Sequence, residues 1–167
     1  MKNKDLLIGV DIALNTSGYA ILDENKKLYK TGLIETKKHW DYYDKINFLY
    51  DEFYNLFQII LNKKPNSLTL ILEGRLKGGF SGQTLASIEG ARVASYLAYY
   101  HVFGGDLKTS VYNPNEVKYY FANKRGAKKN EMYEAVTQTH KSLRKLEFQE
   151  DIFDAIYLCL YHIDKEN

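Results

Sequence analysis

Residues 6–22 read LLIGVDIALNTSGYAIL, in which two short apolar segments flank an aspartate and a small polar turn. The continuous apolar run over residues 6–10 has the length of a strand that is buried on both faces, and it ends at Asp11. Residues 15–18 are Asn, Thr, Ser and Gly, and they predict a turn into a second strand over residues 19–22. The chain is therefore expected to open with a hairpin that carries a carboxylate where its first strand ends.

The later segments predict the rest of an α/β sheet. Residues 27–35 return as a third antiparallel strand, and residues 68–72 (LTLIL) form a fourth, buried strand that ends at Glu73. Further elements are expected as a helix over 41–61, a helix over 83–102, a strand over 109–112, a helix capped by Asn113 that runs to 121, and helices over 128–143 and 149–163. This order predicts a mixed five-stranded sheet, three antiparallel strands and then parallel additions, flanked by helices.

Length and composition limit the class of protein. A chain of 167 residues fits one domain, here residues 1–167, and 45% hydrophobic residues are enough for a sizeable core. The single cysteine, Cys159, excludes an intramolecular disulfide and a CxxC zinc site. The sequence has no apolar run of 18 residues and no signal peptide, so we expect no membrane association and a cytoplasmic location.

Positive charge is concentrated in one segment, although the net charge is only +2. Residues 108–145 contain nine Lys or Arg and three Glu. Such a segment can neutralise the phosphates of a nucleic acid. For any single lysine, a solvated helix face is an equally good interpretation.

Four acids occupy positions where packing alone rarely requires them. Asp11 and Glu73 follow buried strands, at the carboxyl ends where active sites of such sheets gather. Asp151 and Asp154 lie three residues apart and so share one helix face. Taken singly, Asp11 fits a turn residue and Asp151 fits the start of a helix. Together the four carboxylates offer the oxygen ligands that Mg²⁺ prefers.

These motifs resemble those of the RuvC-like Holliday junction resolvases, members of the ribonuclease H-like superfamily. The stretch IGVDIALNTSGYAIL (8–22) resembles the family's first strand, catalytic aspartate and return strand. LILEG (70–74) resembles its second acidic strand, and DIFDAIYLCLYH (151–162) its helix with two acids three residues apart. The motifs occur in the family's order across nearly the whole chain, which makes the match far more specific than any one of them.

The resemblance implies a ribonuclease H-like fold and a Mg²⁺-dependent endodeoxyribonuclease that resolves Holliday junctions by cutting branched DNA. Two Mg²⁺ ions, for which Mn²⁺ is expected to substitute, would be held by the acidic tetrad of Asp11, Glu73, Asp151 and Asp154. It also implies a homodimer, for which the helix over 83–102 is our candidate interface, and a bacterial or phage source.

The resemblance also implies DNA-binding residues. In NEVKYYFANKRGAKKNEM (115–132), Lys118 and Lys129 stand at the positions of the family's functional lysines, with Lys128 adjacent. The glycine-rich stretch after Glu73 adds Arg75, Lys77 and Phe80. Phe80 is either the aromatic wedge that the family inserts at the junction or an anchor of its own loop.

Two other functions agree with part of the sequence. An actin-like or sugar-kinase-type phosphotransferase also begins with a strand, an aspartate, a turn and a strand, but it generally needs two domains and a glycine-rich phosphate motif, and Leu14 and Asn15 replace the glycines here. A non-catalytic nucleic-acid-binding module would use the lysines and tyrosines alone. The presence of all four acids favours the nuclease.

Overall fold

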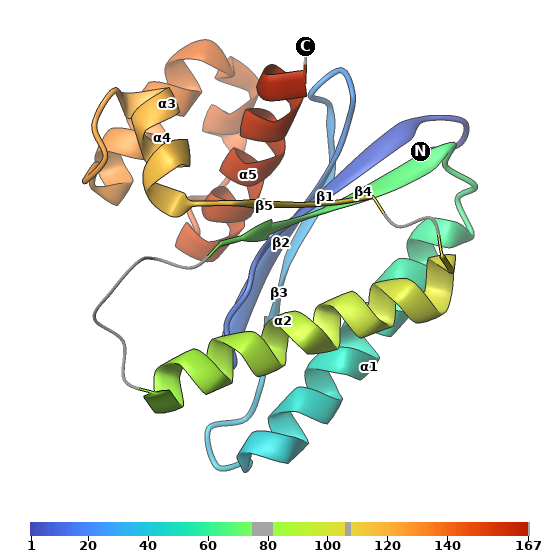
Figure 1. Ribbon diagram of the computed structural model, residues 1–167. Coiled ribbons are helices and arrows are strands. Elements are labelled where there is room, and N and C mark those ends of the chain that lie inside the picture. The colour runs from blue at the N-terminus through green and yellow to red at the C-terminus, as the bar shows by residue number, and fades with distance from the viewer. Residues whose placement is uncertain (75–81, 106–107, 167) are drawn as a thin grey trace.

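A computed structural model describes residues 1–74, 82–105 and 108–166 of the chain. Its single sheet has the strand order β3-β2-β1-β4-β5 (Figure 1). β1 pairs antiparallel with β2, which pairs antiparallel with β3, while β1 pairs parallel with β4 and β4 with β5. The strands are β1 (Asp5–Asp11), β2 (Thr16–Asp23), β3 (Leu28–Glu35), β4 (Ser67–Glu73) and β5 (Lys108–Tyr112). The predicted mixed five-stranded sheet is confirmed, and its first strand lies in the centre.

Helices cover both faces of this sheet. One face packs on α1 (Tyr42–Leu61) and α2 (Gly82–Phe103), and the other on α3 (Pro114–Ala122), α4 (Lys129–Thr139) and α5 (Glu150–Glu166) (Figure 1). Alternation along β1 divides the core accordingly, since Ile8 and Val10 pack with the α1 and α2 residues and Leu7 packs with the α5 residues. The position of a strand residue therefore decides which helices its side chain meets.

Local sequence explains where the helices begin and end. The side chain of Asn113 accepts a hydrogen bond from the amide of Asn115 at 2.9 Å, and Pro114 occupies the first turn of α3 as expected. The helix expected over 128–143 is shorter than predicted. It ends at Thr139, because the backbone of His140 leaves the helical region (φ −111°, ψ 71°), and a separate 3₁₀ helix follows over Lys141–Lys145. The Thr139 hydroxyl bonds back to the Val136 carbonyl at 3.0 Å, a contact that competes with helix continuation.

Small residues line the inner face of α2. Gly90 lies against Tyr42 of α1, whose hydroxyl donates to the Ala86 carbonyl at 3.3 Å, so the two helices approach closely. Several larger apolar side chains of α2 point outward instead, although Tyr99 is buried. The exposed ones are Val93, Tyr96, Leu97 and Tyr100. In the part of the chain that the structure describes, no helix combines the length and the apolar character needed to cross a membrane.

Candidate active site

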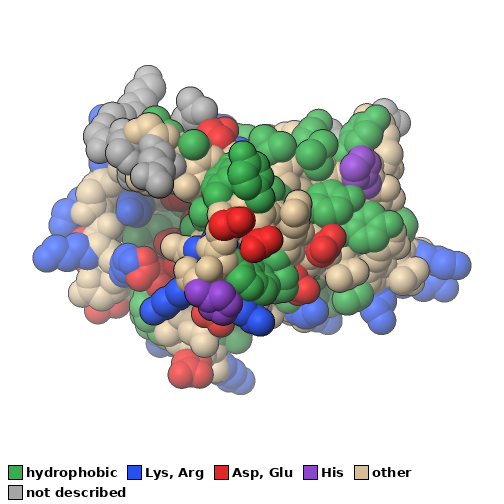
Figure 2. Space-filling model, turned by 90° about the horizontal axis from the view of Figure 1, so that it is seen from below, with side chains coloured by type: hydrophobic (Ala, Val, Ile, Leu, Met, Phe, Trp, Pro, Cys, Tyr) green, Lys and Arg blue, Asp and Glu red, His purple; other side chains and the backbone are tan. Residues whose placement is uncertain are grey.

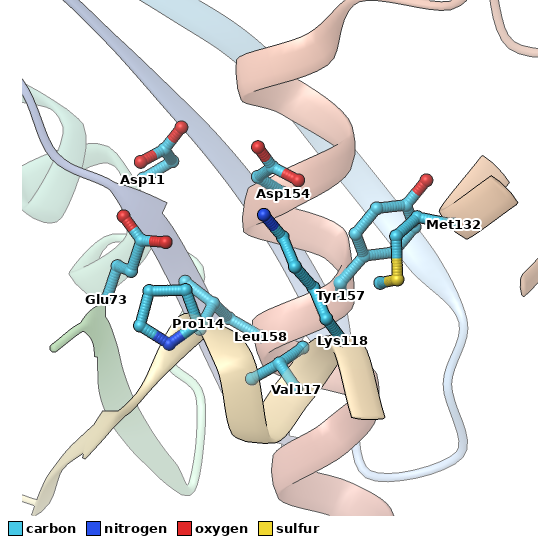
Figure 3. A pocket seen from close by; sticks show the side chains of 9 residues that line it. All are labelled: Asp11, Glu73, Pro114, Val117, Lys118, Met132, Asp154, Tyr157 and Leu158. Atoms are coloured by element: carbon cyan, nitrogen blue, oxygen red, sulfur yellow. The ribbon is translucent and has the colours of Figure 1, made fainter. Parts of the chain in front are cut away.

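Two of the predicted acids lie side by side where parallel strands end. The register of β1 and β4 pairs Val10 with Leu72, and Asp11 and Glu73 are the next residues and the last of their strands. Val10 and Leu72 pack with the α1 and α2 residues. Because side chains alternate along a strand, Asp11 and Glu73 point to the opposite face, which α5 covers. Figure 3 shows both carboxyl groups directed into one pocket.

Helix α5 lies directly on the first two strands because glycines face it. A Cβ atom at Gly9 would lie 2.1 Å from the carbonyl oxygen of Ala155, and one at Gly18 would lie 2.1 Å from that of Asp151. Only glycine permits so close an approach of two backbones. The contact brings the first turns of α5 to the end of β1, where Asp154 enters the pocket wall (Figure 3).

The pocket is small and partly apolar. Its volume is about 40 Å³, enough for a few water molecules or ions. Carboxyl groups and one ammonium group form its polar side, and α3, α4 and α5 supply the apolar side. The lining residues are Asp11, Glu73, Pro114, Val117, Lys118, Met132, Asp154, Tyr157 and Leu158. Asp151 is not among them, so three of the four predicted acids line the pocket directly.

Burial and mutual repulsion perturb the acid at the centre of the group. The pKa of Asp11 rises to about 8, first because burial removes water from its carboxyl group. The negative charges of Glu73, Asp154 and Asp151 raise it further. Asp151 therefore acts on the pocket electrostatically although it does not line it. The charges of the other three acids thus all act on Asp11.

The other two lining acids are partly compensated. Burial, followed by the charge of Glu73, raises the pKa of Asp154 to about 6, while Lys118 and Lys129 act in the opposite direction. Burial also raises the pKa of Glu73, and a hydrogen bond with Asp11 and the charges of Lys118 and Arg92 reduce that rise. Lysine and arginine side chains thus surround the negative charge without neutralising it.

This donor set suits a hard divalent cation in its chemistry. Carboxylate oxygens are the ligands that Mg²⁺ prefers, and a bound cation would relieve the repulsion that raises the pKa of Asp11. Among residues 1–74, 82–105 and 108–166, no three His, Cys, Asp or Glu side chains stand in an arrangement that holds a metal ion. The acids therefore converge on one pocket without forming a closed coordination shell.

The predicted lysines occupy different places around the pocket. The ammonium of Lys118, on α3, points into the pocket beside Asp154 (Figure 3). Lys129, at the start of α4, forms an ion pair with Glu150 at the start of α5, and its charge also reaches Asp154. Lys128 is exposed, and its main-chain amide donates to Glu131 at 2.6 Å. Of the neighbouring pair, Lys129 is thus the one that acts on the acids.

The predicted DNA-binding residues of the glycine-rich stretch lie outside the described residues. These are Arg75, Lys77 and Phe80.

Sequence reasoning missed two residues beside the acids. Arg92, the only Lys or Arg in the segment 82–103, donates from Nη2 to the main-chain carbonyl of Glu73 at 2.7 Å. Tyr157 lines the pocket one turn after Asp154, and its buried hydroxyl has no hydrogen-bond partner among the described residues. Arg92 could have been noticed in the sequence as a single cation within a helix that is rich in small residues. Tyr157 looks like an ordinary core residue in the sequence.

Comparison with known proteins supports one architecture. No family model matches the chain. The crossover junction endodeoxyribonuclease RuvC of Brachyspira hyodysenteriae is 26% identical over 164 residues, which are 96% of this chain and 94% of the relative.

Solved structures agree at the level of the fold. The Thermus thermophilus RuvC in complex with a Holliday junction substrate superposes with a TM-score of 0.75 at 14% identity, covering 94% of this chain and 91% of the other. The yeast mitochondrial Holliday junction resolvase gives a TM-score of 0.60 at 12% identity, covering 98% and 78%. The predicted ribonuclease H-like fold is confirmed.

Proposed function

We propose that this chain, which resembles the RuvC-like Holliday junction resolvases over nearly its whole length, is a metal-dependent endonuclease that cuts phosphodiester bonds in branched DNA. One observation carries the proposal: acids from two adjacent parallel strand ends and from a helix meet a lysine at one small pocket. The RuvC relative, which the chain matches along 96% of its length, supports the same activity. We take residues 1–167 to form a single nuclease domain.

The acids would hold the divalent cations of this reaction. In our proposal Asp11, Glu73 and Asp154 would hold the two Mg²⁺ ions, with Asp11 at the centre of the ligand set, and Asp151 would adjust or join it. The central place of Asp11 fits this role, because the charges of the other three all act on it. When bound, such ions activate a water molecule and stabilise the leaving 3′ oxygen. Mn²⁺, which also accepts oxygen ligands, is expected to substitute.

The chain's own cations would orient the substrate. Lys118 lies in the pocket wall, so it is placed to hold the phosphate whose bond is cut and to offset the charge that develops there. Lys129 and Lys128 lie at the start of α4, and their exposed side chains are placed for neighbouring phosphates of the backbone. The apolar side chains of Val117, Met132 and Leu158 keep water from that side of the pocket.

We also propose a homodimer through α2. Val93, Tyr96, Leu97 and Tyr100 are between 41% and 53% exposed, and their spacing places them on one helix face. Hydrophobic side chains gather on the side of the molecule that carries α1 and α2 (Figure 2). A two-fold axis through such a face would give two cutting sites, as symmetric cleavage of a four-way junction requires. The bacterial relative supports action in a bacterial cytoplasm, whether the gene is cellular or from a phage.

A substrate panel tests the proposed function. A synthetic four-way junction, a flap and a plain duplex are incubated with the protein in Mg²⁺, Mn²⁺ or EDTA. We expect cleavage of the junction with either metal, none in EDTA, and little cutting of the duplex. ATP binding or hydrolysis without DNA cleavage would favour a phosphotransferase. Junction binding without cleavage under any metal condition would favour a non-catalytic module.

A further inference from the structure

Arg92 on α2 reaches the end of β4 and is held there firmly. Its Nη2 donates to the main-chain carbonyl oxygen of Glu73 at 2.7 Å, and its Nη1 pairs with the Glu89 carboxylate at 2.5 Å. The side chain is 16% exposed. Its Nε is buried and has no hydrogen-bond partner among the described residues. The guanidinium thus stays beside Glu73 although the described residues offer one of its donors no acceptor.

The main chain that follows Glu73 is fixed on both sides of the peptide bond. The amide of Gly74 donates to the carbonyl oxygen of Tyr112 in β5 at 2.6 Å, while Arg92 takes the carbonyl of Glu73. Two bonds to one peptide unit restrict the backbone torsion at Glu73 and so the direction in which its carboxyl group leaves the strand. That carboxyl group lines the pocket.

Tyr99 forms the same kind of contact at the other end of the strand. Its buried hydroxyl donates to the main-chain carbonyl of Leu68, near the start of β4. Helix α2 is therefore bonded to β4 at both ends, by a neutral donor far from the pocket and by a cation next to it. Of these two contacts, only that of Arg92 places a positive charge beside the acids of the pocket.

We propose that Arg92 is a positioning residue for DNA cleavage. It orients Glu73 through the main chain and places a fixed positive charge beside the acidic group. The inference rests on the proposed function, because it assigns Arg92 to the same reaction. It adds a residue of α2 to a site otherwise built from β1, β4, α3, α4 and α5.

The test compares Arg92→Gln with Tyr99→Phe, each of which removes one bond between α2 and β4. For junction cleavage in Mg²⁺, Arg92→Gln is expected to lower kcat about 10- to 100-fold while KM is unchanged, since small displacements of a reacting group have effects of this size. Arg92→Lys, which keeps a charged donor, should recover part of the rate. Tyr99→Phe should lower the melting temperature and leave kcat as in the wild type.

A second readout uses the protein without metal or DNA. Hydrogen exchange at the Gly74 amide should accelerate in Arg92→Gln and not in Tyr99→Phe. A wild-type kcat in Arg92→Gln, or an equal loss of kcat in Tyr99→Phe, would overturn the positioning role. Unchanged exchange at the Gly74 amide in Arg92→Gln would overturn the role of the bond between Arg92 and the Glu73 carbonyl. Inactive wild-type protein would instead contradict the proposed function, with the exchange result still deciding whether Arg92 fixes Glu73. Where Arg92→Gln does not fold, Arg92→Lys provides the same comparison with a smaller expected loss.

Discussion

Asp11 shows how a single residue can oppose stability and serve chemistry. Its carboxyl group is partly buried near three other acids, and its pKa of about 8 compares with 3.8 for the free group. Between these values the unfolded chain has lost a proton that the folded protein keeps. The free energy of unfolding must therefore fall as the pH rises through this range. It is recovered only when the negative charge of the Asp11 carboxylate is neutralised.

The first prediction concerns this pH dependence. In EDTA, the melting temperature of the wild type should fall between pH 5 and pH 8, and that of Asp11→Asn should fall less. At pH 8 the variant should melt several degrees higher, because each kcal/mol corresponds to about 2–4 °C in a chain of this size. Adding Mg²⁺ at pH 8 should stabilise the wild type and not the variant. Asp51→Asn, which changes an exposed acid of α1, should follow the wild type. Identical dependence of the melting temperature on pH in wild type and Asp11→Asn would show that the Asp11 carboxyl group does not lower stability in this way.

The second prediction concerns Lys118. Its ammonium lies in the pocket wall beside Asp154, so Lys118→Ala should weaken junction cleavage. If the lysine contacts one phosphate, the slope of log Kd against log salt should decrease by about 1. Lys4→Ala is the matched control, since Lys4 precedes β1 at the end remote from Asp11 and pairs with Glu24 at 3.4 Å. Cleavage rates equal to the wild type at every ionic strength would argue against a phosphate contact.

At the scale of elements, the site depends on how closely α5 approaches the sheet. Gly9 in β1 and Gly18 in β2 leave no room for a side chain beneath α5. These positions determine the height of Asp154 above the end of β1. The two acids of α5 thus depend on glycines that are far away in the sequence.

The third prediction tests this packing. Gly18→Ala should destabilise the protein by about 1–3 kcal/mol, the usual effect of overpacking, because its Cβ would meet the backbone of Asp151. It should also reduce cleavage by displacing α5. Gly82→Ala is the control, because a Cβ there meets nothing within 4 Å and the residue begins α2. Thermal unfolding measures the stability of both variants. Equal melting temperatures for the two variants would mean that the close approach of α5 is not tight.

A helix or strand could be predicted from the sequence where its signal lies in its own residues. The apolar runs before Asp11 and Glu73 were sufficient to predict β1 and β4, because a strand buried on both faces requires them. The division of the expected 128–143 helix at His140 was not predicted, since it depends on side-chain bonds to nearby carbonyls. The inward face of α2 carries little hydrophobic periodicity, because its buried residues are mostly small.

The site was predictable only where chemistry shows in the residue type. Acids that follow apolar strands or share one helix face are conspicuous in a sequence, so the four could be named, and three of them line the pocket. Arg92 could not be assigned, because its contact with Glu73 joins a helix and a strand end that are 19 residues apart. The place of Tyr157 in the pocket wall depends in the same way on the packing of α5 against α4.

At the scale of the whole molecule, α2 is expected to join two copies. The fourth prediction is that Leu97→Asp shifts the protein toward monomer in sedimentation experiments, because it places a charge within the exposed apolar face of α2. Tyr119→Asp is the matched control, since Tyr119 is similarly exposed but lies on α3, across the sheet. A wild type that sediments as a monomer at high concentration would contradict the dimer.

In our proposal the acids form one metal-dependent cutting site. Single-turnover cleavage of a four-way junction in Mg²⁺ by wild type, Asp11→Asn and Glu73→Gln tests this role of the acids. We predict that each substitution lowers the cleavage rate by at least on the order of 10³-fold, as losses of essential groups do, while junction binding is retained. Cleavage by either variant at the wild-type rate would contradict the account.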